Sequence, residues 1–225
     1  MNWFRKLVTR MRPMKTEALR GLHPIFSKRK YAGWQDMELE IGNIAETKEK
    51  GDAFEQFCYF YLLYHKDLYQ IEEIWSDKIR GREVPGDIRE KYKLEKKDYG
   101  VDGVSRLTNN RIEGWQAKFR SDQSSPTVRE LSTFWTESEY CDSKRTLANT
   151  PRLPIIAKKK INHEQTLLDK FLDLREDFFA SLFETAVGSE IIIRPRKFIP
   201  RPHQENMISA VVKGLQEHDR GKLID

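Results

Sequence analysis

Residues 99–119 read YGVDGVSRLTNNRIEGWQAKF, and this stretch decides the fold. It holds two β-prone runs, 99–107 and 112–119, which are rich in valine, isoleucine and aromatic residues. Between them lies TNN at 108–110, a turn signal. Two such runs around a turn predict a β-hairpin.

The polar residues of this hairpin are expected to meet. Side chains of a strand alternate between its two faces, so Gln116 and Lys118 share one face while Trp115 and Ala117 share the other. Burying an amide and an ammonium without partners is costly, so we expect the polar pair to line a cleft. Asp102, on the first strand, can reach the same cleft.

The segments around the hairpin predict further helices and strands. Apolar residues recur at three- and four-residue steps over 46–66, which favours a helix. Thr127 followed by Glu130 is typical of a capping box and predicts a helix over 127–140. The charged residues 80–98 are expected to form a solvated loop. The other expected elements are strands at 70–79, 145–150 and 191–193, one long helix at 161–187, a helix at 204–218, and loop with a short helix over 13–45. This order predicts an α/β fold.

Composition argues against several classes of protein. The chain of 225 residues is 38% hydrophobic and 33% charged, and its 11% aromatic residues can supply a core. It has no run of about 18 apolar residues, so no membrane span is predicted, and no secretory signal is apparent. Cys58 and Cys141 lack the number and spacing of a disulfide framework or a zinc site. We therefore expect a cytoplasmic protein.

Positive charge is concentrated near the N-terminus. Residues 1–30 contain nine Lys or Arg and one acid, so residues 1–45 are expected to form a basic arm that contacts nucleic acid or docks on a partner. Alternatives are an amphipathic helix on a membrane, an organelle presequence, or a solvated tail without a role. The residues expected to bind DNA phosphates are Arg5, Lys6, Arg10, Arg12, Lys28, Arg29 and Lys30.

The cleft of the hairpin has the oxygen donors that a hard divalent cation prefers. Asp102 offers a carboxylate, Gln116 an amide oxygen and Ala117 a backbone carbonyl, a set suited to Mg²⁺, with Mn²⁺ as a substitute. Lys118 could position an attacking water and stabilise charge on phosphoryl oxygens. Glu55, in the preceding helix, is a further candidate carboxylate. The alternative is an ordinary salt-bridged hairpin.

Three short motifs resemble those of the Mrr-like branch of the PD-(D/E)xK restriction endonuclease superfamily. They are GDAFE at 51–55, GVDGV at 100–104 and WQAK at 115–118, in the order of that branch's G-x-x-F-E helix, G-[IV]-D strand and Q-x-K strand. The resemblance covers residues 46–150. It implies a restriction-endonuclease-like core, in which helices flank a central mixed sheet.

The resemblance also implies roles for individual residues. Asp102 would be the metal-binding acid, Gln116 would replace the second acid, Lys118 would be the catalytic lysine and Glu55 an accessory acid. The glutamine lowers the negative charge of the site, a change that this branch usually shows. Asp98 competes with Asp102 for the acid's role, and Asp102 is favoured because it lies within the apolar strand pattern.

A second resemblance lies near the C-terminus. FIPRPHQEN at 198–206 is similar to the opening segment of superfamily 2 helicases, in which the glutamine, here Gln204, reads the adenine edge. Residues 222–225 would then be the strand that leads into a phosphate loop. Because the sequence contains no such loop, ATP is expected to bind only in a longer chain. The alternative is a surface helix.

These features predict four segments and one function. The segments are a basic arm at 1–45, a nuclease core at 46–150, a helical connector at 151–190 and the start of a helicase domain at 191–225. The expected function is that of a Mg²⁺-dependent DNA endonuclease domain within a nuclease–helicase, as in type I single-polypeptide restriction enzymes and defence helicases against phage. A homodimer would supply two sites for double-strand cleavage. A catalytically silent DNA-binding or partner-docking module is the alternative, and RNA remains open as a substrate.

Overall fold

The computed structural model describes residues 22–95, 100–188 and 191–193, together with 206, 207, 209–211 and 213. The chain divides into two compact units, Met1–Arg194 and Pro195–Asp225. In the second unit the described residues are helical and fall within the helix expected at 204–218, whereas Gln204 lies outside the described residues. All helices and strands named below belong to the first unit.

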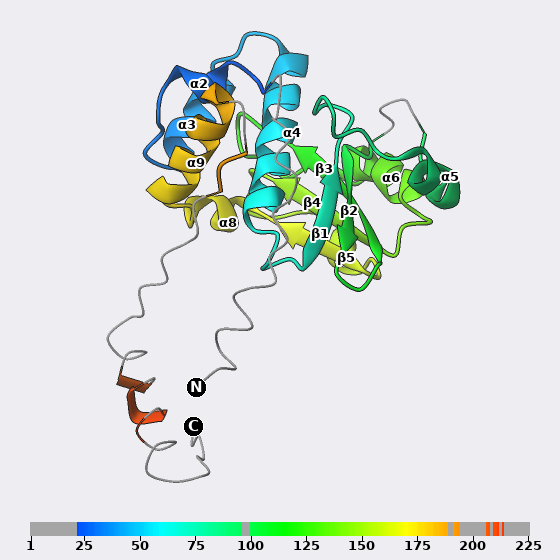
Figure 1. The fold of residues 1–225 in the computed structure, drawn as a ribbon. Coiled ribbons are helices and arrows are strands. Elements are labelled where there is room, and N and C mark those ends of the chain that lie inside the picture. The colour runs from blue at the N-terminus through cyan, green and yellow to red at the C-terminus, as the bar shows by residue number, and fades with distance from the viewer. Residues whose placement is uncertain are drawn as a thin grey trace. The chain divides into compact units, whose positions relative to one another are not determined.

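The described residues form a five-stranded mixed sheet in the order β1-β2-β3-β4-β5 (Figure 1). The strands β1 and β2, and β2 and β3, pair antiparallel, whereas β3 and β4, and β4 and β5, pair parallel. This confirms the predicted hairpin and the α/β fold with a central mixed sheet. The strands are β1 (Ile71–Trp75), β2 (Gly103–Leu107), β3 (Ile112–Lys118), β4 (Ser143–Ala148) and β5 (His163–Thr166).

Helices cover both faces of the sheet. In Figure 1, α4 crosses one face, α6 lies on the other, and α2, α3 and α9 gather beyond α4. Neighbouring residues of β4 divide accordingly: Leu147 joins the cluster of α4, and Ala148 joins the cluster of α6. The helices are α2 (Ile25–Lys28), α3 (Trp34–Gly42), α4 (Thr47–Tyr64), α5 (Gly86–Tyr92), α6 (Val128–Glu137), α7 (Ile155–Lys158), α8 (Leu168–Leu172) and α9 (Glu176–Val187).

Aromatic side chains join the N-terminal helices and the last helices to α4. The ring centroid of Trp34 on α3 lies 4.9 Å from that of Phe57 on α4 and 5.0 Å from that of Phe171 on α8. Phe57 also lies 5.6 Å from Phe178 on α9. All four side chains are buried. Helices α2 and α3, which lie in the expected arm at 1–45, therefore pack into the core. Helices α8 and α9, which lie in the expected connector at 151–190, do so as well.

Three local predictions are confirmed. Helix α4 lies within the expected 46–66, and the hairpin strands lie within 99–107 and 112–119. Helix α6 begins with the predicted capping box, in which the Thr127 side chain accepts from the Glu130 backbone and the Glu130 side chain accepts from the Thr127 backbone.

Other local predictions are wrong. The single helix expected at 161–187 is replaced by β5, α8 and α9, because residues 163–166 pair with the edge of β4. The expected loop at 80–98 contains α5, which begins after Pro85 and buries Ile88 and Tyr92. The strand expected at 145–150 is present as β4, but it begins and ends two residues earlier. Residues 191–193 are described but are not in a strand.

An ion pair buried in the sheet holds β3 and β4 together. The Nε and Nη2 atoms of Arg145 donate to the two carboxylate oxygens of Glu113 at 2.8 and 3.2 Å. Glu113 is 2% exposed and Arg145 is 8% exposed, and the guanidinium also lies 4.4 Å from the ring centroid of Tyr69. Burial lowers the pKa of Arg145, but the Glu113 carboxylate, together with Tyr69 and Glu164, brings it above its ordinary value. Removing either side chain would therefore leave the charge of the other buried without its partner.

We expect Glu113→Ala to lower the free energy of unfolding by about 3–5 kcal/mol, because it leaves the buried Arg145 charge without its partner. The control is Glu73→Ala, which removes an exposed ion pair with Arg106 and is expected to cost less than about 1 kcal/mol. Urea denaturation of both variants measures the difference. Equal losses would contradict this account of the buried pair.

Candidate functional site

All five strands of the described sheet have an end at one edge. Because β1, β3, β4 and β5 run in one direction and β2 runs in the opposite direction, the first four end where β2 begins. Asp102 directly precedes β2, and Lys118 is the last residue of β3. The topology therefore brings two of the predicted site residues to the same edge.

Asp102 completes the pairing of β3 with its side chain. The regular ladder between β2 and β3 ends at the pair Gly103 and Trp115. Beyond it, the Asp102 backbone N–H donates to the Trp115 carbonyl at 3.0 Å, and the Ala117 N–H donates to Asp102 Oδ2 at 2.6 Å. The carboxylate thus takes the place of a strand carbonyl. The hydrogen bond holds the carboxylate beside Ala117, the residue between Gln116 and Lys118.

Gln116 is buried, with 1% exposure, although the sequence predicted it on a polar face. Its Nε2 donates to the Gly100 carbonyl at 2.7 Å. Its Oε1 is buried and accepts no hydrogen bond from any residue that the structure describes. A buried amide oxygen of this kind can accept a hydrogen bond or ligate a cation.

Lys118 is partly exposed at the end of β3. Among the described residues, no acceptor forms a hydrogen bond or ion pair with its ammonium group. An ammonium at this position can donate to an anionic group that enters the site.

Helix α4 brings Glu55 toward the same region. Burial raises the pKa of the Cys58 thiol well above its ordinary value, and the charges of Asp102 and Glu55 raise it further. Both carboxylates therefore lie within electrostatic range of one buried thiol, one turn of α4 beyond Glu55. A thiol with so high a pKa is unreactive, in agreement with an inert role for Cys58.

Two glycines let the backbone pass close to the site. Gly100 has φ +109°, and a Cβ there would lie 3.1 Å from Gln116 Nε2. A Cβ on Gly103 would lie 2.5 Å from the Trp75 carbonyl oxygen and closer still to the indole ring of Trp115. The glycines of the GVDG stretch are thus required by close approach, which the sequence motif alone did not explain.

The turn after β1 contacts Asp102 on the side away from β3. Ser76 Oγ donates to the Asp102 carbonyl at 2.8 Å, and Lys78 Nζ donates to Asp52 Oδ1 on α4 at 2.9 Å. Sequence reasoning missed these residues because it placed 70–79 in a strand. The usable signal was the polar run SDK at 76–78, directly after the apolar strand pattern.

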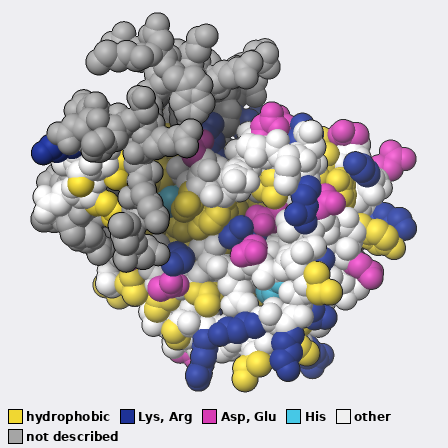
Figure 2. Space-filling view, turned by 90° about the horizontal axis from the view of Figure 1, so that it is seen from below, with side chains coloured by type: hydrophobic (Ala, Val, Ile, Leu, Met, Phe, Trp, Pro, Cys, Tyr) yellow, Lys and Arg dark blue, Asp and Glu magenta, His cyan; other side chains and the backbone are white. Residues whose placement is uncertain are grey.

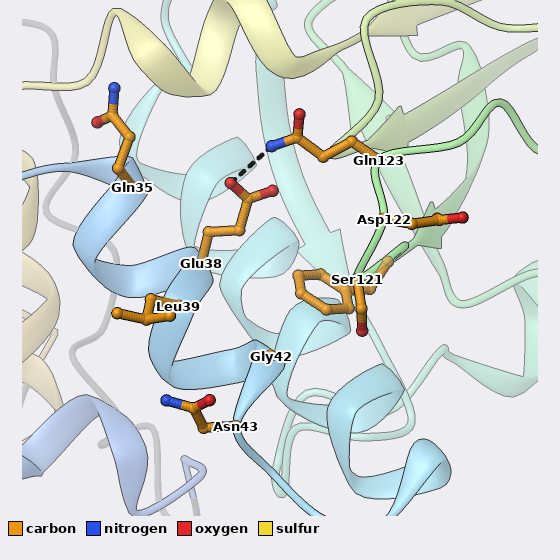
Figure 3. Close-up of a pocket in the computed structure, with 9 residues that line it drawn as sticks. Gln35, Glu38, Leu39, Gly42, Asn43, Ser121, Asp122 and Gln123 are labelled. Atoms are coloured by element: carbon orange, nitrogen blue, oxygen red, sulfur yellow. Dashed lines mark hydrogen bonds between the residues drawn. The ribbon is translucent and has the colours of Figure 1, made fainter.

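A pocket of about 470 Å³ lies between α3 and the residues that follow β3 (Figure 3). The Glu38 carboxylate accepts from Gln123 Nε2 at 2.9 Å and from Asn149 Nδ2 at 2.7 Å. Asn149 also accepts from the Arg120 N–H at 2.6 Å. This network ties α3 to the ends of β3 and β4. No signal in the sequence pointed to Glu38.

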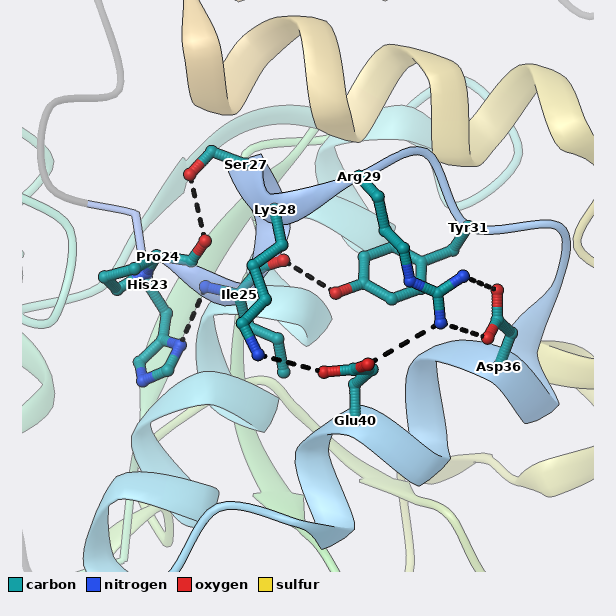
Figure 4. Close-up of polar contacts among 9 residues, drawn as sticks. All are labelled: His23, Pro24, Ile25, Ser27, Lys28, Arg29, Tyr31, Asp36 and Glu40. Atoms are coloured by element: carbon teal, nitrogen blue, oxygen red, sulfur yellow. Dashed lines mark hydrogen bonds and ion pairs between the residues drawn. The ribbon is translucent and has the colours of Figure 1, made fainter.

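The basic residues predicted to bind DNA are only partly described. Arg5, Lys6, Arg10 and Arg12, as well as Asp98, lie outside the described residues. Lys28 pairs with Glu40 at 3.2 Å, and Arg29 pairs with both Asp36 and Glu40 (Figure 4). Lys30 Nζ lies 4.0 Å from Glu184 Oε1. The charges of residues 28–30 are therefore largely offset within the fold.

Charge is also mixed over a wider surface. Figure 2 shows Lys, Arg, Asp and Glu side chains mixed over the middle of the described face, and Lys and Arg side chains gathered along its lower margin. A polyanion bound over the middle of this face would meet charges of both signs.

The oxygen donors near this edge of the sheet are of the type that a hard cation prefers and zinc does not. Asp102 and Glu55 supply carboxylates, and Gln116 Oε1 is a buried oxygen without a partner among the described residues. Mg²⁺ is usually held by one or two carboxylates together with water and phosphate oxygens. Within the described residues, no group of three or more His, Cys, Asp or Glu is arranged to hold a metal ion.

Comparison with known proteins gives one informative likeness. No protein-family model and no curated protein matches the chain. The structure is similar to that of LlaBIII, an ATP-dependent Type ISP restriction-modification enzyme bound to DNA, with a TM-score of 0.55 and 19% identity. The match covers 87% of this chain and 12% of that chain, so the chain spans a small part of that enzyme's length. The likeness establishes the fold.

One further property concerns membranes. Among the described residues, no helix has both the length and the apolar character needed to cross a bilayer.

We expect Gly103→Ala to destabilise the protein by about 1–3 kcal/mol or more, because the added Cβ would overlap the indole of Trp115. The matched control is Gly51→Ala on α4, where no atom lies within 4 Å of the added Cβ, and a gain of about 0.5–1 kcal/mol is expected. Thermal unfolding of the two variants compares them. A Gly103→Ala variant as stable as the parent chain would refute the close packing of β2 on Trp115.

Proposed function

We propose that this chain contains the Mg²⁺-dependent endonuclease domain of a larger restriction-type enzyme and that it cleaves DNA phosphodiester bonds. The observation that carries the proposal is the hydrogen bond from the Ala117 N–H to Asp102 Oδ2, at 2.6 Å. Through it, the acid lies beside the Gln116–Lys118 segment at one strand end. The fold likeness to a restriction-modification enzyme that was solved with DNA supports this class of substrate.

Four groups of the chain would hold the cation in this proposal. They are the Asp102 carboxylate, Gln116 Oε1, the Ala117 carbonyl and the Glu55 carboxylate. A bound Mg²⁺ would supply positive charge that stabilises the phosphoryl oxygens as negative charge develops on them. With Gln116 in place of an acid, the protein groups carry two negative charges, which balance a divalent cation.

Lys118 acts on the substrate itself. Hydrolysis adds water across the phosphodiester: a new bond forms between the water oxygen and phosphorus, one ester bond breaks, and the leaving oxygen takes up a proton. The Lys118 ammonium donates hydrogen bonds to a phosphoryl oxygen or to the attacking water, which orients the water and stabilises developing charge.

The remaining parts of the proposal concern the larger enzyme. A helicase or translocase in the same polypeptide would bind ATP and move DNA to the nuclease, and a second copy of the nuclease would cleave the other strand. The chain itself supplies the phosphodiester chemistry.

We expect the intact chain to nick or linearise supercoiled plasmid DNA in Mg²⁺ or Mn²⁺ and to be inactive in EDTA. Asp102→Asn and Lys118→Met are each expected to reduce the rate at least about 100-fold. Asparagine still accepts from the Ala117 N–H, so Asp102→Asn tests the charge rather than the fold. Agarose gel electrophoresis measures the product.

The matched control is Lys66→Met, two residues beyond the C-terminal end of α4, which is expected to cleave like the parent chain. If the folded chain binds DNA and metal but leaves the plasmid intact, the endonuclease proposal fails and a catalytically silent binding module replaces it.

A second prediction uses Gln116→Glu. Glutamate cannot donate to the Gly100 carbonyl, and its charge would be buried, so the variant is expected to unfold about 2 kcal/mol more easily in EDTA. Adding Mg²⁺ should stabilise this variant more than it stabilises the parent chain, because the ion gains a carboxylate ligand. Thermal unfolding with and without Mg²⁺ measures both effects. Equal Mg²⁺ responses would place the ion elsewhere.

A further inference from the structure

A second lysine lies at the sheet edge, on the turn that follows β1. Lys78 Nζ donates to Asp52 Oδ1 at 2.9 Å, and the two side chains are 28% and 31% exposed. Asp52 lies one turn before Glu55 on α4, so both acids occupy the same side of that helix. The ion pair therefore joins the β1 turn to the part of α4 that faces the site.

The turn is held against Asp102 by hydrogen bonds. Ser76 Oγ donates to the Asp102 carbonyl at 2.8 Å and accepts from the Lys78 N–H at 3.3 Å. One hydroxyl thus links the backbone that carries Lys78 to the backbone that carries Asp102. Because Trp75 pairs with Val104, this turn lies alongside the start of β2. Lys78 is consequently positioned relative to Asp102 by the sheet itself.

The ion pair between Lys78 and Asp52 contributes little to the stability of the fold. A partly exposed ion pair contributes about 0–1 kcal/mol to folding. The carboxylate of Asp52, however, presents to the ammonium the same kind of oxygen acceptor that a DNA phosphate presents. Partial exposure leaves room for a phosphate oxygen to take the place of the carboxylate.

We propose that Lys78 binds a backbone phosphate of DNA next to the bond that is cleaved, and that Asp52 holds its ammonium in position when DNA is absent. This inference rests on the proposed endonuclease function and adds a substrate contact to that site. Asp52 and the phosphate compete for one ammonium, so the two residues have opposite effects on binding: Lys78 strengthens it and Asp52 weakens it.

The experiment measures binding of a fluorescently labelled DNA duplex to the full chain by anisotropy, in EDTA so that the DNA stays intact, over a series of salt concentrations. Lys78→Gln is expected to weaken binding about tenfold and to reduce the slope of log affinity against log salt by about 1, the value for one lost phosphate contact. Lys78→Arg should restore the slope, and Asp52→Asn should tighten binding. A merely structural role for Lys78 would not change the slope.

The control is Lys66→Gln, which removes a lysine just beyond the C-terminal end of α4. If Lys78→Gln gives the affinity and slope of Lys66→Gln, or if the intact chain does not bind the duplex, the inference is overturned. If the intact chain cleaves plasmid DNA but its binding does not depend on Lys78, the inference about Lys78 fails and the endonuclease proposal stands. Lys78-dependent binding without cleavage of plasmid would support the contact and reject the endonuclease.

Discussion

The candidate site depends on the Asp102 carboxylate, which accepts a hydrogen bond from β3 that a backbone carbonyl of a neighbouring strand would otherwise accept. Strand β2 begins only at Gly103, while the antiparallel β3 continues past its Gly103 partner Trp115 to Lys118, so the Ala117 N–H would lack a backbone partner on the β2 side. Asp102 Oδ2 accepts from it at 2.6 Å. Because an unpaired buried N–H costs about 1–3 kcal/mol, the position of the acid is fixed by backbone satisfaction rather than by a flexible loop. The geometry that closes the ladder is also the geometry that brings acid, amide and lysine together.

Those parts of the site could be predicted that depend on residues close together in the sequence. The hairpin, α4 and the capping box of α6 follow from periodicity and from residues three apart, and register then brings Asp102 beside Gln116 and Lys118. The helix expected at 161–187 failed because β5 forms only against the edge of β4, a partner about 20 residues away. Contacts between distant segments left no local pattern, and the Ser76 to Asp102 bond spans 26 residues.

For the three described basic residues of segment 1–30, the net charge of the segment leaves out their partners. Composition over residues 1–30 indicates strong positive charge, yet Lys28 and Arg29 pair with Asp36 and Glu40, acids that lie just beyond that window. Net charge describes a segment, whereas the field that a polyanion meets depends on which charges are paired in space. Conversely, Lys118 lies outside the basic N-terminal segment and is unpaired within the described residues.

The hairpin turn lies at the opposite end of β2 and β3 from Asp102. The Leu107 N–H donates to the Arg111 carbonyl at 2.9 Å and closes the turn, and Asn110 adopts a left-handed conformation within it. Asn109 and Asn110 are exposed there. Since register on the Asp102 side is held separately by the hydrogen bond from the Ala117 N–H to Asp102, extra residues at 109–110 would lengthen the loop without shifting the strands. This turn is therefore the natural insertion point for an affinity tag or a fluorescent reporter.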